Sequence, residues 1–150
     1  MKANTLRRGM NLWPPYLFSG IRVASISQDY REAEVRLKQH WYNRNYVGTH
    51  FGGSLFAMTD AMYMLMLLNV LGRAYYVWDQ RASIDYLKPG RGTVKARFRL
   101  DDAALAKIYE NTAGGEKYLP EFQVDITDEK DEVIARLVRT LYIKKKPPKP

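Results

Sequence analysis

The sequence has no cysteine among its 150 residues. Disulfides, thiolate nucleophiles and cysteine-ligated zinc are therefore excluded. Histidine is scarce as well, because only His40 and His50 are present, so a Ser-His-Asp triad would have to use one of these two side chains. The cluster of Asp125, Asp128 and Asp131 lacks the central glycine of a calcium loop. We therefore expect no metal site and no cofactor.

Long apolar runs are also rare. The longest one, from Leu55 to Leu71, contains Thr59, Asp60 and Asn69, and a buried core helix is a better interpretation than a membrane span. Pro14-Pro15 interrupts the apolar stretch near the N-terminus, which argues against a signal peptide. We expect a cytoplasmic protein that does not bind membranes.

The formal net charge is +8, and four of the positive charges are lysines 144, 145, 146 and 149. A solvated surface with a charged tail explains this balance. Nucleic-acid binding would rest on charge alone, since no recognition motif accompanies it. We therefore expect no nucleic-acid partner.

The length suits one domain, which we expect over residues 1–143, followed by a disordered basic, Pro-rich tail over residues 144–150. Apolar residues alternate with charged ones at residues 33–37, 94–100 and 122–126, a pattern typical of half-buried strands. Residues 54–71 are apolar on nearly every helical face, which is typical of a helix buried on all sides. The sequence predicts an α+β fold, in which a curved antiparallel sheet wraps around this central helix.

One residue of the predicted central helix is unusual. Asp60 is the only charged residue between His50 and Arg73, and burying an unpartnered carboxylate costs several kcal/mol. It could be a structural acid that hydrogen-bonds a loop or faces solvent through a gap. It could also be a general base whose pKa is raised by apolar surroundings. The neighbouring Gly52-Gly53-Ser54 segment lacks the second glycine of a nucleophile elbow.

Two segments carry a resemblance to a known family. They are Asn45-Tyr46-Val47-Gly48-Thr49-His50-Phe51-Gly52-Gly53-Ser54-Leu55-Phe56-Ala57-Met58-Thr59-Asp60 and Ser83-Ile84-Asp85-Tyr86-Leu87-Lys88-Pro89. Together they resemble hotdog-fold thioesterases of the phenylacetyl-CoA and 4-hydroxybenzoyl-CoA type, and most of all an uncharacterised bacterial thioesterase-like branch. The resemblance implies the hotdog fold and hydrolysis of an acyl-CoA or acyl-carrier-protein thioester.

The resemblance also implies roles for residues. Asp60 would be the general base or the nucleophile, Asn45 would position water or Asp60, and the Gly53 amide would hold the thioester oxygen. Substrate binding would involve Gly52, His50, Phe51, Ser54, Ser83, Lys88 and Arg91. Arg44 or Arg73 would help the Lys88–Arg91 turn to meet the coenzyme A phosphates. Hotdog sites lie between protomers, so a homodimer or homotetramer is implied.

One position departs from the family pattern. Phe51 stands where the family has histidine, and His50 comes one residue earlier. This departure favours a second hypothesis, a non-catalytic acyl-CoA-binding hotdog module. The His50-Phe51 pair also resembles the His-Phe of hotdog dehydratases and hydratases, but the acid follows too soon for that group.

Overall fold

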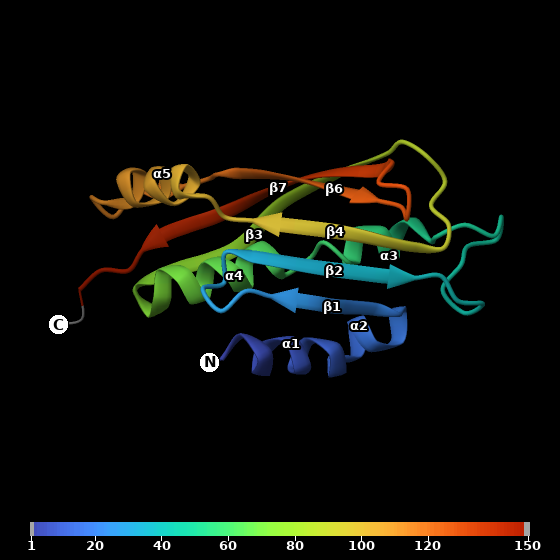
Figure 1. Cartoon of the computed structure of the whole chain (residues 1–150). Coiled ribbons are helices and arrows are strands. Elements are labelled where there is room, and N and C mark those ends of the chain that lie inside the picture. Colours follow the sequence, from blue (N-terminus) through green and yellow to red (C-terminus); the bar gives the residue numbers. More distant parts are fainter. Residues whose placement is uncertain (1, 149–150) are drawn as a thin grey trace.

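The protein is described by a computed structural model over residues 2–148. Seven strands form one antiparallel sheet in the order β1-β2-β4-β6-β7-β3, and the short β5 pairs with β7. The sheet lies across helices α3 and α4 (Figure 1). The strands are β1 (Ile21–Ile26), β2 (Glu32–Lys38), β3 (Tyr75–Tyr86), β4 (Thr93–Arg99), β5 (Lys117–Tyr118), β6 (Glu121–Thr127) and β7 (Val133–Lys145).

Alternating burial along the strands explains why the sheet has one inner face. In β2, Ala33, Val35 and Leu37 are buried between charged residues that face outward. β4 and β6 repeat this pattern. Because successive side chains of a strand point to opposite faces, each strand contributes one apolar row to the core. The predicted antiparallel sheet around a central helix is confirmed.

The central helix differs from its prediction in one detail. It begins at Gly52 rather than Ser54, and it consists of α3 (Gly52–Ala57) and α4 (Met62–Leu71), followed by a 3₁₀ turn, η1 (Gly72–Ala74). The four residues 58–61 between the two helices are not helical. The helix is therefore interrupted at the position of Asp60.

The hydrogen bonds at the interruption include one from a distant strand. In a continuous helix, the Asp60 amide would donate to the carbonyl of Phe56. Instead the Phe56 carbonyl accepts from Nη2 of Arg139 (3.1 Å) and from the hydroxyl of Thr59 (2.9 Å). The Asp60 amide donates to Ala57 instead (3.0 Å). A side chain from β7 thus competes with the helix for its own acceptor.

The apolar side chains of this helix form the centre of the core. Met58, Met62, Met66 and Leu67 are all buried. Counted through its break, the segment Gly52–Ala74 is long and apolar enough to cross a membrane. It packs on the sheet as the core helix, with Met62, Met66 and Leu67 in the same cluster as the strand residues.

The two edges of the sheet differ. Beside β1 lie α1 (Ala3–Leu12) and α2 (Pro14–Ser19) (Figure 1). The side chain of Asn11 pairs with the outer edge of β1, because its Nδ2 donates to the Val23 carbonyl (3.1 Å) and its Oδ1 accepts from the Val23 amide (2.7 Å). The opposite edge is β3, where residues 80–86 are exposed or only half-buried on both faces. The β1 edge is therefore covered by the N-terminal helices, whereas the β3 edge is open to pairing with another strand.

The C-terminal part begins with α5 (Asp102–Thr112), which is capped by Asp101 accepting from the Ala104 amide (2.7 Å). β7 then continues to Lys145, where Lys144 pairs with Tyr76 and Lys145 with Tyr75. Two residues assigned to the tail on sequence are therefore part of the sheet. Residues 149–150 lie outside the described residues.

Candidate active site

Asp60 lies in the break between α3 and α4, not within a helix. Its side chain is 51% exposed, and Oδ1 lies 3.0 Å from Nη1 of Arg139. The next residue, Ala61, has a φ of 65°, a left-handed conformation that costs about 1–2 kcal/mol for a residue with a Cβ. The expectation of apolar surroundings is therefore wrong, because the carboxylate faces a guanidinium and solvent.

The backbone of Asp60 is held as well as its side chain. Tyr16 from α2 is buried and donates its hydroxyl to the carbonyl oxygen of Asp60 (2.6 Å). Burial raises the pKa of the Tyr16 hydroxyl, and the charge of Asp60 raises it further. The phenol therefore remains a proton donor at neutral pH, which fixes the chain at the break.

Arg139 organises this region, and sequence reasoning missed it. It is 2% exposed and donates to the Oδ1 atoms of Asp60 (3.0 Å) and Asp79 (3.5 Å). It also binds the hydroxyl of Thr59 (3.1 Å) and lies 5.0 Å from the centre of the Phe56 ring. A planar guanidinium suits this position because its five donors are arranged in a fixed fork.

A signal for Arg139 was present in the sequence. Ala135, Leu137, Leu141 and Ile143 of β7 are all buried and share one face of the strand. Arg139 occupies the same alternation, so an arginine stands where the pattern calls for an apolar residue. A charge in a core-facing register predicts an acidic partner nearby.

Asp79 of β3 is the second acid of the cluster. Burial raises the pKa of its carboxyl, Arg139 opposes this shift, and the charge of Asp60 adds to it. One guanidinium thus serves two carboxylates. The cluster carries a formal charge of one negative unit when both acids are ionised.

The predicted oxyanion site lies at the start of α3. The amides of Gly52 and Gly53 belong to the first turn, where N–H groups have no partner within the helix. A Cβ on Gly53 would lie 2.4 Å from the Phe51 ring, and one on Gly52 would lie 2.9 Å from the Tyr86 hydroxyl. The Tyr86 hydroxyl donates to the Gly52 carbonyl (3.0 Å). Both positions require glycine, and Phe51, itself 56% exposed, covers the second one.

Asn45 holds the loop that precedes α3. Its side-chain amide donates to the Thr49 hydroxyl (2.8 Å) and to the His50 carbonyl (3.3 Å), while its Oδ1 accepts from the Thr49 amide (3.0 Å). No hydrogen bond in residues 2–148 joins this side chain to Asp60. Its contribution in a single chain is to shape the entry to the helix.

His50 faces the interior rather than a substrate. It is buried, and its Nε2 lies 2.8 Å from the carbonyl oxygen of Gly92. Its Nδ1 is buried without a hydrogen-bond partner in the described part of the chain. Burial lowers the pKa of the imidazole, and the bond to Gly92 opposes this shift. The neutral ring joins the 40–50 loop to the segment before β4.

The remaining predicted binding residues are spread along the molecule. Ser54 is buried at the start of α3, and Ser83 lies on the open edge strand opposite Val138. Lys88 pairs with Glu132 (2.6 Å), and Arg91 donates to the Gly48 carbonyl (3.1 Å). Arg73 precedes β3 and Lys88 follows it, so about 40 Å of strand separates them. The structure does not bring Arg73 to the Lys88–Arg91 turn.

Within one chain, the two halves of the predicted site do not meet. Gly53 and Asp60 are seven residues apart, a separation that would span about 10 Å in a continuous helix, and part of the break between α3 and α4 lies between them. An oxyanion donor must lie about 3 Å from the thioester oxygen, and the base must reach the attacking water at a similar distance. One carbonyl cannot satisfy both groups of a single chain.

Comparisons with known proteins agree with this architecture. A family model described as a domain of unknown function (DUF4442) matches residues 3–143. The comparison with curated proteins gave no match.

Solved structures share the fold at low identity. A Pseudomonas aeruginosa protein described as a probable thioesterase has a TM-score of 0.83 at 17% identity, with 97% of each chain covered. A Haemophilus influenzae thioesterase has a TM-score of 0.70 at 16% identity, covering 97% of this chain and 92% of the other. A Chlorobaculum tepidum protein of unknown function has a TM-score of 0.73 at 15% identity, covering 97% and 98%. The fold is that of thioesterase-like hotdog proteins.

Proposed function

The chain belongs to the DUF4442 family, and on this premise we propose that it is a thioester hydrolase acting on acyl-CoA or on acyl-carrier-protein thioesters. The observation that carries the proposal is the half-exposed carboxylate of Asp60, which a buried arginine and a strained backbone hold in the break of the central helix. Because half of this side chain is exposed, water and a substrate can reach the carboxylate.

The carboxylate is arranged as a base would be. Within residues 2–148 its side-chain hydrogen bonds reach Oδ1 alone, so Oδ2 can accept a proton. In the proposed step, Oδ2 takes a proton from water as the water oxygen attacks the thioester carbonyl carbon. The C–S bond then breaks, and the thiolate leaves and is protonated by solvent. Direct attack by Oδ2, followed by hydrolysis of the resulting anhydride, uses the same geometry.

The thioester oxygen would be held by the amides at the start of α3. The absence of Cβ atoms at Gly52 and Gly53 lets a ligand approach the backbone closely. In this proposal the negative charge that develops on the oxygen is met by N–H groups that are already in place. Phe51 would have to turn away from Gly53 to admit the substrate.

Two observations support an assembly that completes the site. The two half-sites lie about 10 Å apart in one chain, and β3 is an open edge with exposed faces. Antiparallel pairing of two β3 edges about an axis between Ala82 and Ser83 would set Tyr86 of one copy opposite Asp79 of the other. Since Tyr86 binds Gly52 and Asp79 shares Arg139 with Asp60, each oxyanion half-site would approach the acid of the other copy. We propose a homodimer as the smallest active unit; two dimers could build a homotetramer.

The second candidate function is a non-catalytic acyl-CoA-binding module. The Phe51 ring lies where a Cβ on Gly53 would stand, and this favours the module, because the ring occupies space that a thioester would need beside Gly53. A hotdog dehydratase is less well supported, since the buried His50 already uses its Nε2 on the Gly92 carbonyl.

The test compares wild type with Asp60→Asn in a thiol-release assay over a panel of acyl-CoAs, with melting temperature measured on the same preparations. Asparagine keeps the shape but cannot act as a base, so turnover should fall by about 10²–10⁴ while the fold persists. Glu110→Gln, at an exposed acid on α5, is the matched control. An equally active Asp60→Asn protein would show that the carboxylate is not the catalyst. Binding without turnover in wild type would favour the module.

A further inference from the structure

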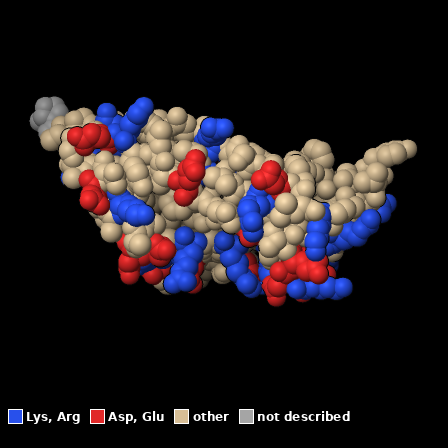
Figure 2. Space-filling view, turned by 90° about the horizontal axis from the view of Figure 1, so that it is seen from above, with Lys and Arg blue, Asp and Glu red and all other residues tan. Residues whose placement is uncertain are grey.

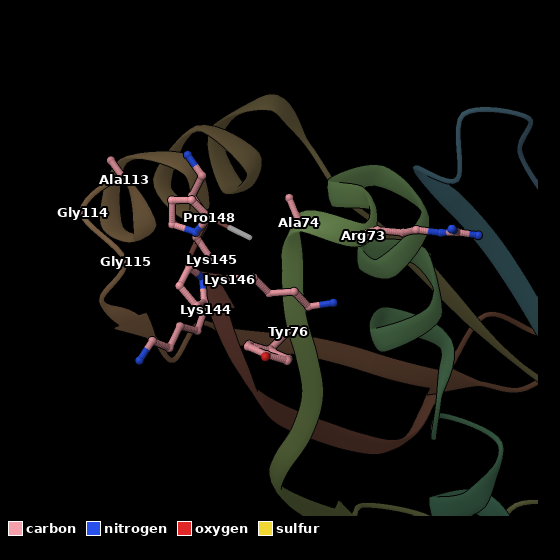
Figure 3. Close-up of a pocket in the computed structure, with 11 residues that line it drawn as sticks. Arg73, Ala74, Tyr76, Ala113, Gly114, Gly115, Lys144, Lys145, Lys146 and Pro148 are labelled. Carbon is pink, nitrogen blue, oxygen red and sulfur yellow. The ribbon is translucent and has the colours of Figure 1, made fainter. Parts of the chain in front are cut away.

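A hollow at the far end of β3 is not part of the site described above. It has a volume of about 980 Å³ and lies between η1, the loop after α5 and the end of β7 (Figure 3). Three separate parts of the chain therefore build it. Its lining residues are Arg73, Ala74, Tyr76, Ala113, Gly114, Gly115, Lys144, Lys145, Lys146, Pro147 and Pro148.

The charge of this hollow has one sign. Four of its lining residues are cations and none is acidic. In the described part of the chain, none of these four side chains takes part in an ion pair. Glu116 borders the hollow with its carboxylate against Gly114, but it does not line it. Cations without acidic partners around one hollow give it a positive potential that attracts anions.

The charged side chains on the outer face of the sheet are arranged differently, because several of them form ion pairs. On the sheet, Arg36 and Arg97 pair with Glu34, and Arg136 pairs with Asp125 through two hydrogen bonds. Figure 2 shows positive and negative side chains interleaved along one margin of the molecule. Eight lysines and arginines of residues 2–148 take part in ion pairs, so the hollow is distinguished by the gathering of four unpaired cations on one lining without an acid.

The hollow also offers an aromatic surface. Tyr76 is 45% exposed, and the amino group of Lys146 lies 4.9 Å from the centre of its ring. The Lys146 amide donates to the Ala74 carbonyl (2.7 Å), which fixes the end of β7 against η1. Further along the same strand, Trp78 stacks on Tyr142 with ring centres 4.0 Å apart. Aromatic rings beside unpaired cations are suited to a base that stacks and phosphates that pair.

From these observations we propose that the hollow binds a phosphorylated nucleotide, with the lysines meeting the phosphates and Tyr76 contacting the base. The proposed function supplies the natural source, the 3′-phospho-ADP end of coenzyme A. Asp79 lies three residues from Tyr76 on β3, which is about 10 Å along the strand. Tyr76 points to the outer face of the sheet and Asp79 to the inner face, so the hollow and the Asp60 cluster lie near the same part of the open edge but on opposite faces. Only the identity of the ligand rests on the thioesterase proposal.

The test is calorimetric binding by the full chain without turnover. The probes are coenzyme A, dephospho-coenzyme A, adenosine 3′,5′-bisphosphate and inorganic pyrophosphate. The test variant is Lys144→Gln/Lys146→Gln, which keeps the side-chain stems. The matched control is Arg8→Gln/Lys130→Gln, which removes two exposed cations outside the hollow. Tyr76→Ala tests the base contact.

We expect wild type and control to bind coenzyme A and the bisphosphate equally. The dissociation constant should rise about tenfold in Lys144→Gln/Lys146→Gln, since each exposed charge contact contributes modestly. Tyr76→Ala should weaken the binding of the nucleotides but not that of pyrophosphate. Weaker binding of dephospho-coenzyme A would assign recognition to the 3′-phosphate, and equal binding would assign it to the pyrophosphate; either supports the site.

Three results would overturn the inference. Wild type could fail to bind any nucleotide, or the two double variants could bind coenzyme A with equal affinity. Pyrophosphate could also bind as tightly as the nucleotides, which would mean an adventitious ion only. Nucleotide binding that depends on the lysines in a protein without hydrolase activity would leave this site standing and refute the thioesterase. Hydrolysis with an unchanged KM in Lys144→Gln/Lys146→Gln would refute this site and leave the thioesterase proposal standing.

Discussion

Arg139→Met is the most informative single change, because it removes the group that holds the helix break together. Methionine has similar length and leaves no large cavity, but it cannot donate a hydrogen bond. The Phe56 carbonyl and the Thr59 hydroxyl would lose a donor, and Asp60 and Asp79 would lose their shared cation. The change therefore isolates the contribution of the guanidinium.

The magnitude follows from the burial of each partner. Removing one member of a buried ion pair costs about 3–5 kcal/mol. Asp60 is half-exposed and Asp79 is 21% exposed, so water can recover part of the loss. We expect about 3 kcal/mol, the lower end of that range. For a chain of this length, that corresponds to a fall in Tm of about 6–12 °C.

The assay is thermal unfolding followed by circular dichroism, combined with a double-mutant cycle that includes Asp79→Asn. Removing both charges should cost less than the sum of the single changes, with a coupling of about 1–3 kcal/mol. Arg139→Lys is the conservative control: it keeps one charge but loses the fork that reaches several acceptors, so it should fall between wild type and Arg139→Met. A Tm for Arg139→Met within about 2 °C of wild type, or strict additivity with Asp79→Asn, would refute this reasoning.

Three further predictions concern neighbouring groups. Burial raises the pKa of Asp79 above its ordinary 3.8, so the folded state binds the proton more tightly and wild-type stability falls as the pH rises through that region. In thermal melts from pH 3 to 7, the Tm of Asp79→Asn should rise relative to that of wild type as the pH rises. Parallel curves of Tm against pH for the two proteins would contradict this. Burial lowers the pKa of His50 below its ordinary 6.5, so wild type should lose stability as the pH falls below that value, whereas His50→Gln should lack this loss in denaturant titrations. Phe51→Ala should uncover Gly53 and raise kcat/KM for an acyl-CoA several-fold in the thiol-release assay, and a lower value would mean that the ring binds substrate.

The sequence was a good guide to elements whose cause is local. Alternation in β2, β4 and β6 and the all-round apolar character of residues 62–71 were sufficient to predict strands and a core helix. The break at residues 58–61 could not be predicted in this way. Its cause is Arg139, which lies 80 residues away from Thr59 in the chain. Neither local propensity nor periodicity contains such a contact.

The candidate site was predicted in part for the same reason. Asp60 stood out because no other charge accompanies it in its apolar segment. Arg139 is one of 24 lysines and arginines, and it becomes visible only when its register in β7 is compared with its neighbours. The spacing of Gly53 and Asp60 agreed with the family pattern, yet spacing alone does not say that the two groups are too far apart in one chain. That conclusion needs the length of the helix between them.

The pairing of Asn11 with Val23 has a consequence for stoichiometry. A strand edge with free amides and carbonyls is a template for further growth, and a sheet with two such edges can polymerise into a fibre. Here a side-chain amide occupies the backbone groups of Val23, and α1 lies beside β1 (Figure 1), so within residues 2–148 β3 is the edge left open. In two copies joined through β3, the outer edges of the combined sheet would be the two covered β1 strands, and assembly would stop at the dimer. The N-terminal helix thus limits the growth of the sheet at the β1 edge, and this would protect the protein from edge-to-edge aggregation.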